Sequence, residues 1–250
     1  MERDITEYEE RYSEDVCGFE KYKVIYRRKK ILEAINKYQP GTVLEIGCGL
    51  EPLFCYEKDC RFTVVEPSEK FYERARHLSR QDSRVTCIRG FFEETVSDLQ
   101  RRDEGYDMVV CSALLHEVER PETLLRAIKK VSGKKTVIHI NVPNMYSMHR
   151  LLGVETGMLS DVFGRSEGNV RLRQHTNFDM RKLKTMVEEN GMTVVEEGSY
   201  FVKPFSHWQM QEMMERQIID DSVLDGLYKL AEYMPQFGSE IYVNCRVKGQ

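Results

Sequence analysis

The sequence predicts an α/β protein built on a doubly wound, mainly parallel sheet of seven strands with helices on both faces. Between residues 42 and 142, short apolar runs alternate with longer segments whose apolar residues recur at helical spacing. Such alternation indicates β-α-β crossovers, which place neighbouring strands parallel. The apolar runs are nearly continuous, as in strands covered on both faces. Two further strand-like runs towards the C-terminal end complete the seven.

The individual elements follow from local signals. Residues 19–39 predict a helix, because isoleucine and leucine recur near helical spacing until Pro40 ends the pattern. Ser68 is a suitable N-cap for a helix over 68–78. Further helical segments are expected at 121–131, 179–190 and in the methionine-rich stretch 208–233, and strands at 42–46, 62–65, 84–88, 106–111, 135–142, 193–202 and 241–247.

The length fits one large domain with additions. We expect an N-terminal helical lid over residues 1–40 and a main domain over 41–250. Within the main domain, the glycine-, arginine- and histidine-containing segment of about 143–178 is expected to form a cap after the fifth strand. A helical insertion is expected at about 208–235, where methionines at helical spacing predict core packing.

Composition limits the classes of protein that fit. The 250 residues include 37 Lys+Arg and 41 Asp+Glu, for a net charge of -4, and 41% are hydrophobic, so a core can form. The mild acidity argues against sequence-independent binding to nucleic acid, which needs a basic surface. No apolar run approaches the ~18–20 residues of a membrane span, and the N-terminal segment is too charged for a signal peptide. We therefore expect a soluble, cytoplasmic protein.

The cysteines do not suggest a disulfide scaffold or a metal site. There are seven, an odd number, and they are scattered along the chain. Cys55 and Cys60 form an isolated pair with no second pair nearby. Most of the cysteines are therefore expected to be buried free thiols, and no metal ligands are assigned.

The most informative motif is VLEIGCG at residues 43–49, followed by Glu66 at the end of the next predicted strand. A glycine turn after a strand lets backbone N–H groups approach a ligand closely. An acidic residue about 20 positions further on can accept hydrogen bonds from the hydroxyls of a ribose. A dinucleotide fingerprint would place a third glycine where this chain has Pro52, so an NAD site is disfavoured.

The E-x-G-x-G motif instead resembles motif I of the class I S-adenosylmethionine-dependent methyltransferases, which have a Rossmann-like fold. The resemblance continues through RGFFEE at 89–94, YDMVVCSALLHEV at 106–118 and the strand at 135–143. It implies S-adenosyl-L-methionine as the cofactor and S-adenosyl-L-homocysteine as its product, with no metal. It further implies that the cofactor contacts Glu45, Gly47, Cys48, Gly49, Glu66, Pro67, Gly90, Phe91, Phe92, Ser112 and Leu114.

The methyl acceptor is indicated by the cap. The segments 142–153 and 173–179 resemble bacterial methyltransferases that tailor natural products, phosphonates and surface sugars. Arginine binds carboxylate or phosphate oxygens bidentately, so an anionic acceptor is expected, either a carboxylate such as a peptide C-terminus or a phosphonate. A solvated loop with surface arginines is the alternative. The residues assigned to the acceptor are Tyr26, Arg27, His149, Arg150, Arg173 and His175.

Two histidines are the candidates for catalysis, His116 and His175. An ionised acceptor oxygen needs no base, whereas a sugar hydroxyl needs one of them to remove a proton. The expected partner is therefore a small-molecule or peptide acceptor, with no nucleic acid and no membrane. The rival functions are a sugar O- or N-methyltransferase that uses a histidine base, and a non-catalytic nucleotide-binding module.

Overall fold

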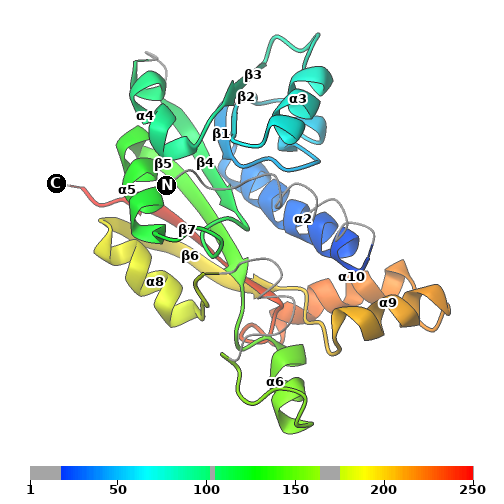
Figure 1. Cartoon of the computed structure of the whole chain (residues 1–250). Coiled ribbons are helices and arrows are strands. Elements are labelled where there is room, and N and C mark those ends of the chain that lie inside the picture. The colour runs from blue at the N-terminus through cyan, green and yellow to red at the C-terminus, as the bar shows by residue number, and fades with distance from the viewer. Residues whose placement is uncertain (1–17, 102–104, 164–174, 250) are drawn as a thin grey trace.

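The computed structural model describes residues 18–101, 105–163 and 175–249. At its centre is a seven-stranded sheet in the order β3-β2-β1-β4-β5-β7-β6 (Figure 1). This confirms the predicted mainly parallel sheet. The strands are β1 Thr42–Ile46, β2 Arg61–Glu66, β3 Val85–Arg89, β4 Tyr106–Ser112, β5 Ser132–Pro143, β6 Met192–Tyr200 and β7 Glu240–Val247.

The direction of β7 decides which residues meet at the functional edge of the sheet. Strands β1 to β5 are parallel, and β7 lies antiparallel between β5 and β6. Glu240, the first residue of β7, therefore pairs with Pro143 at the end of β5 and with Tyr200 at the end of β6. We call this side, where the parallel strands end, the carboxyl edge.

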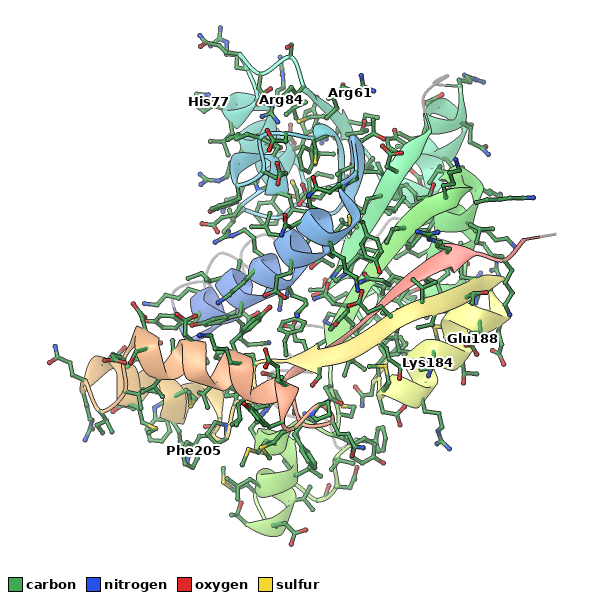
Figure 2. The ribbon with its side chains drawn as sticks, turned by 180° about the vertical axis from the view of Figure 1, so that it is seen from behind. Arg61, His77, Arg84, Lys184, Glu188 and Phe205 are labelled. Carbon is green, nitrogen blue, oxygen red and sulfur yellow. The ribbon has the colours of Figure 1, made fainter. Side chains whose placement is uncertain are left out.

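Helices cover both faces of the sheet, as predicted. Successive strand residues point to opposite faces. Leu44 packs in the cluster under α4, α5 and α8, whereas its neighbour Val43 packs in the cluster under α2 and α3. The first layer lies in front of the sheet in Figure 1, and Figure 2 shows α2 from the other side. These helices are α2 Glu20–Tyr38, α3 Glu69–Leu78, α4 Phe92–Gln100, α5 Pro121–Val131 and α8 Met180–Glu189.

Three more helices, α6 Met148–Glu155, α9 His207–Glu215 and α10 Asp221–Lys229, lie beyond the carboxyl edge (Figure 1). The methionine-rich segment is thus two helices joined by a turn, in which Gln217 has a left-handed φ of 56°. Met210 of the predicted apolar stripe is buried in the aromatic cluster between α2 and α10. Ile218 is 64% exposed, because it falls in the turn.

Local signals located most element ends within a few residues. Ser68 caps α3, and its hydroxyl accepts a hydrogen bond from the Phe71 N–H at 3.1 Å. Helix α4 was not predicted, because residues 89–94 resemble a ligand-binding loop and Phe91 at its N-cap forms no side-chain cap. Short 3-10 turns occur at Leu53–Cys55 and Leu230–Glu232. Within the described ranges, none of the helices has the length and hydropathy needed to span a bilayer.

Candidate active site

The glycine motif forms a tight loop at the carboxyl edge. Gly47 and Gly49 adopt left-handed φ values of 73° and 56°, a region that favours glycine. The N–H groups of Cys48 and Gly49 donate to one carboxylate oxygen of Glu66, at 2.9 and 3.3 Å. The structure therefore brings the two halves of the predicted nucleoside motif into direct contact.

Glu66 has capacity left for a ligand. Its side chain is buried, and its other oxygen accepts the N–H of Ser68 at 2.9 Å. Burial raises the pKa of Glu66, although these backbone N–H groups favour its charged form. Its Oε2 accepts two backbone amides and also the Cys48 thiol at 3.6 Å, whereas Oε1 accepts one amide and keeps a lone-pair position to which a ribose hydroxyl can donate. The cradle therefore fits the nucleoside part of S-adenosylmethionine.

Other residues predicted to bind the cofactor surround this loop. The N–H of Gly90 donates to the Glu66 carbonyl at 3.2 Å, which holds the β3–α4 turn beside β2 and the following Pro67. Ser112 ends β4 at the same edge. The side chain of Leu114 faces Gly47, since a Cβ on Gly47 would lie 3.7 Å from Leu114 Cδ2.

Glu45 and Phe92 make contacts within the protein. The Glu45 carboxylate accepts the N–H of Leu53, with a closest distance of 3.1 Å, so it anchors the chain that follows the glycine loop. Burial raises its pKa to about 8. Phe92 starts α4 and its ring is buried in the core, because α4 turns this residue towards the sheet. Phe91, at the N-cap, is half-buried beside the same edge.

The N-terminal half of helix α2 reaches the carboxyl edge, whereas its second half packs on one face of the sheet. Arg28 forms an ion pair with Glu51, which follows the glycine loop, and its guanidinium lies 3.5 Å from the centre of the Tyr56 ring. The preceding residue, Arg27, donates through Nε to Glu240 Oε2 at 3.0 Å. One turn of α2 therefore contacts both the segment that follows the glycine loop of residues 47–49, called the nucleoside loop below, and the start of β7.

Glu240 is the centre of a buried polar network. Its Oε2 accepts the side-chain amide of Asn141 at 2.9 Å and the hydroxyl of Tyr200. Lys23 approaches Oε1 at 3.4 Å. Burial opposes its ionisation, but the charges of Arg27 and Lys23 outweigh it and hold the pKa of Glu240 well below its usual range. Sequence reasoning missed this group, although a polar residue close to the end of the run 135–142 could have indicated Asn141.

A backbone hydrogen bond joins the two predicted catalytic histidines, which are far apart in the sequence. The His116 carbonyl accepts the N–H of His175 at 2.9 Å. His116 is buried, and its Nδ1 has no hydrogen-bond partner among the described residues. Burial and the positive charge of Arg27 lower the pKa of His116 to about 3, so its imidazole is neutral near pH 7. His175 is exposed.

The residues predicted to bind the acceptor make separate contacts within the protein. Tyr26 is buried and donates to Asp225 at 3.2 Å, which ties α2 to α10. Arg150 is also buried, and its Nε donates to the Val162 carbonyl at 2.9 Å. His149 precedes it on α6 and has a buried Nδ1 without a partner in the described ranges. Arg173 lies outside the described residues.

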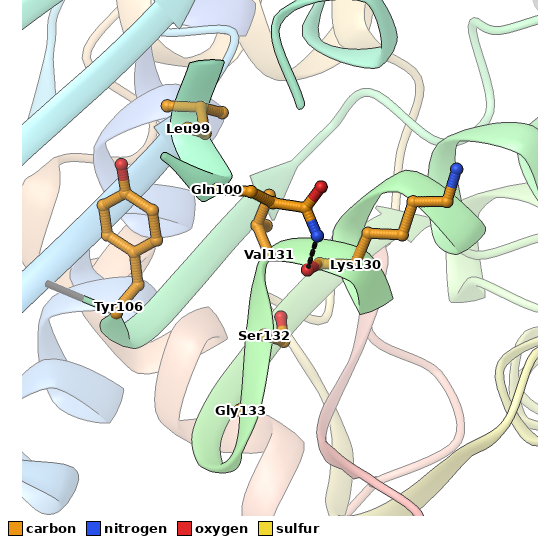
Figure 3. A pocket seen from close by; sticks show the side chains of 8 residues that line it. Leu99, Gln100, Tyr106, Lys130, Val131, Ser132 and Gly133 are labelled. Carbon is orange, nitrogen blue, oxygen red and sulfur yellow. Dashed lines mark hydrogen bonds between the residues drawn. The ribbon is translucent and has the colours of Figure 1, made fainter. Parts of the chain in front are cut away.

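A cavity of about 250 Å³ lies at the opposite edge of the sheet (Figure 3). It is lined by the end of α4, the start of β4 and the α5–β5 junction, and Gln100 donates across it to the Lys130 carbonyl at 2.8 Å. Because ligands of open α/β sheets bind at the carboxyl edge, this cavity is not part of the candidate site. Among the described residues, no three His, Cys, Asp or Glu side chains gather to hold a metal ion.

The fold and the carboxyl edge together define a nucleoside-binding α/β domain. In a comparison with known proteins, residues 44–138 match the family model described as "Methyltransferase domain". Thiol S-methyltransferase TMT1B of Mus musculus is 29% identical over 119 residues, which cover 44% of this chain and 48% of that protein. The match thus spans about half of the curated relative. These matches show that this part of the chain is similar to methyltransferases, and the buried Glu66 carboxylate with its backbone amides is compatible with a nucleoside ligand there.

Solved structures of methyltransferases share the fold. The plantazolicin methyltransferase BamL, solved with a substrate analogue and SAH, has a TM-score of 0.54 at 14% identity, covering 97% of this chain and 88% of its own. The 1,6-didemethyltoxoflavin-N1-methyltransferase of Burkholderia thailandensis, solved with S-adenosylhomocysteine, has a TM-score of 0.53 at 15% identity, covering 89% and 77%. At these identities the similarity extends to the fold alone.

Proposed function

We propose that this protein methylates an anionic oxygen of a small or peptide acceptor, with S-adenosylmethionine as the donor, in bacterial natural-product biosynthesis. The acceptor group is a carboxylate, such as a peptide C-terminus, or a phosphonate. The observation that carries this proposal is the state of His116, which lies buried near the cation of Arg27 and stays neutral. A base with so low a pKa removes protons poorly at neutral pH. An acceptor that is already ionised needs no base.

The charges around His116 favour the same acceptor. Arg27 and Lys23 approach it from α2, so two basic groups lie at the carboxyl edge beyond the glycine loop of residues 47–49. Glu20 and Glu240 pair with the two α2 cations. Cations next to a buried reaction site stabilise a bound anion and hold it in place, which is a large part of what methyl transfer requires.

The donor and the chain contribute different parts of the chemistry. When bound, S-adenosylmethionine supplies an electrophilic methyl group on a positively charged sulfur. Glu66 and the amides of the Gly47–Gly49 loop hold its nucleoside. The basic residues in the N-terminal part of α2, Lys23 and Arg27, orient the acceptor. The helix itself covers the edge and keeps water from the reacting groups.

A thiol is the second candidate acceptor, because the curated relatives matched by residues of this chain are named thiol S-methyltransferases. A thiolate is also an anion and would also be attracted by Arg27 and Lys23. The two acceptors differ in pKa, since a thiol ionises near ~8.5 and a carboxylate near ~4. This difference separates them experimentally.

The test is methyl transfer from deuterium-labelled S-adenosylmethionine to a panel of acceptors, followed by mass spectrometry. The panel contains peptides with free or amidated C-termini, methylphosphonate monoesters, thiols, sugars and amines. We expect labelled esters, with kcat nearly flat between about pH 6.5 and 9. A rise through about pH 8.5 on a thiol would favour S-methylation, and a rise near about pH 6.5 on a sugar would favour a histidine base.

A histidine variant gives an independent reading. His116→Asn should lower kcat only modestly if the acceptor is an oxyanion, because no proton is removed. A loss of ~10²–10⁴ in kcat would show general-base catalysis and overturn the proposal. His77→Asn is the matched control, because His77 is exposed on α3, far from the carboxyl edge (Figure 2). A protein that binds the donor but methylates nothing in the panel would favour a non-catalytic nucleotide-binding module.

A further inference from the structure

A basic cluster lies beside the N-terminal end of α2, and consists of Lys23, His149, Lys203 and His207. Two of its members, Lys203 and His207, lie near the ring of Phe19. Lys203 Nζ lies 5.9 Å from the centre of this ring, and the His207 ring centre lies 5.9 Å from it. The His149 ring stacks on His207 with 6.5 Å between centres. Segments from α2, α6 and the β6–α9 connection thus meet at one place beyond the carboxyl edge (Figure 1).

Lys203 is the unusual member of the basic cluster. Its side chain is fully buried, and its Nζ has no hydrogen-bond partner in the part of the chain that the structure describes. The buried Nδ1 of His149 likewise has none there. Burial, reinforced by the charge of Lys23, lowers the pKa of Lys203 well below its usual range. Burying a polar group without a hydrogen-bond partner lowers the stability of the fold, and a bound ligand can supply that partner.

Among the described residues, the two acidic side chains next to the basic cluster already pair with other cations. Glu20 pairs with Lys23 at 3.3 Å and with Arg27 at 3.1 Å, and Glu240 pairs with the same two residues. These two acidic residues therefore offset two basic ones. The Lys203 amine would add a third positive charge only when it is protonated, so a singly charged anion bound beside it would favour the uptake of one proton.

We propose that Lys203 Nζ and His149 Nδ1 form a subsite that binds the carboxylate or phosphonate group of the acceptor. This inference rests on the proposed function, because it assigns residues to the acceptor's anion. An ammonium group donates strong, charge-assisted hydrogen bonds to an oxyanion, and an imidazole N–H adds a second donor. Lys23 lies one turn before Arg27 on α2, so the subsite adjoins the Glu240 network. His207, which is 47% exposed, extends the basic cluster to the surface.

The test measures anion binding, without any methyl transfer. The full-length protein is labelled with [ε-¹³C]lysine, and the Lys203 signal is assigned by comparison with Lys203→Met. Acetate and methylphosphonate are the probes, titrated separately to millimolar concentrations with chloride at equal ionic strength as the reference. We expect one or both probes to raise the pKa of Lys203 by about one unit or more, because a nearby anion favours the ammonium form. The stronger probe identifies the class of acceptor group.

Two variants separate binding from folding. Lys203→Met should fold and raise the melting temperature of the anion-free protein by a few degrees, because it replaces an unpartnered buried amine with an apolar chain. It should abolish protection by either probe in thermal unfolding. Lys134→Met is the control, because Lys134 is exposed on β5 near its amino end and should leave both properties unchanged.

The proposal is overturned if neither probe moves the Lys203 signal more than chloride does, or if Lys203→Met keeps the same protection by the probes. Such a result would leave the proposed function standing with another acceptor site. Conversely, methyl transfer to a neutral acceptor would refute the proposed function, whether or not Lys203 binds the probes. S-adenosylmethionine affinity should be the same, within about twofold, in wild type and Lys203→Met, which shows that the nucleoside site is intact.

Discussion

Arg27 and Glu240 are 213 residues apart in the chain and form a buried ion pair at the carboxyl edge. The side chains are only 11% and 3% exposed, and the guanidinium donates through both Nε and an Nη group. Planar guanidinium and carboxylate groups fit such bidentate pairing. The pair fixes the N-terminal part of α2 beside the start of β7 at the carboxyl edge.

Removing one partner of this pair should destabilise the fold strongly. We expect Arg27→Met to lower the free energy of unfolding by about 3–5 kcal/mol, because it leaves Glu240 buried without its main cation. The double variant Arg27→Met/Glu240→Leu should recover part of this loss. Urea unfolding of Arg27→Met, Glu240→Leu and the double variant, each relative to wild type, gives the three values, and strict additivity would refute the coupling. Arg101→Met is the control, since its pair with Asp98 is exposed and worth at most about 1 kcal/mol.

Glu66→Ala should weaken S-adenosylmethionine binding by roughly 1.5–3 kcal/mol, because it removes an acceptor for the ribose and also frees the amides of Cys48 and Gly49. Glu66→Gln should lose less, since one oxygen remains to accept. Isothermal titration calorimetry measures both. Glu69→Ala, three residues away on exposed helix surface, should bind normally. Equal affinities for all these variants would contradict the cofactor site.

Gly47→Ala should be destabilising through its backbone alone. Its φ of 73° costs an alanine about 1–3 kcal/mol, whereas the added Cβ meets nothing closer than Leu114 at 3.7 Å. Gly226→Ala is the matched comparison within α10, where nothing lies within 4 Å of the new methyl group. It should stabilise the protein by up to about 1 kcal/mol. Thermal unfolding should therefore show changes of opposite sign, and changes of the same sign would count against this account.

Glu45 should make the stability depend on pH. Burial raises its pKa from 4.5 to about 8, so the folded state holds this proton more tightly than the unfolded state does. Its contribution is complete below pH 4.5 and is lost as the pH rises towards 8. Glu45→Gln keeps an acceptor for the Leu53 N–H and removes the titration. Relative to this variant, wild type should lose stability between about pH 5 and 8 in urea unfolding, and parallel curves would refute the assignment.

The sequence alone determined the order and type of most elements and the position of the nucleoside loop. These features depend on local signals: apolar runs of strand length, the hydroxyl of Ser68 at a helix start, and glycines where the chain turns left-handed after β1. Each acts over a few residues, so spacing along the chain is sufficient to detect it. Strand β7 could be recognised in the same way, but its place between β5 and β6 could not.

Only the tertiary structure decided which polar residues meet beyond the carboxyl edge. The antiparallel entry of β7 brings Glu240 to the carboxyl edge, and the packing of α2, α6 and the β6–α9 connection around Phe19 gathers Lys203 with His149. In the sequence, Lys203 is one lysine among many, and its spacing carries no signal. Its character comes from burial and from the charges of distant segments, because desolvation and Coulomb interactions depend on distance in space and not on separation along the chain.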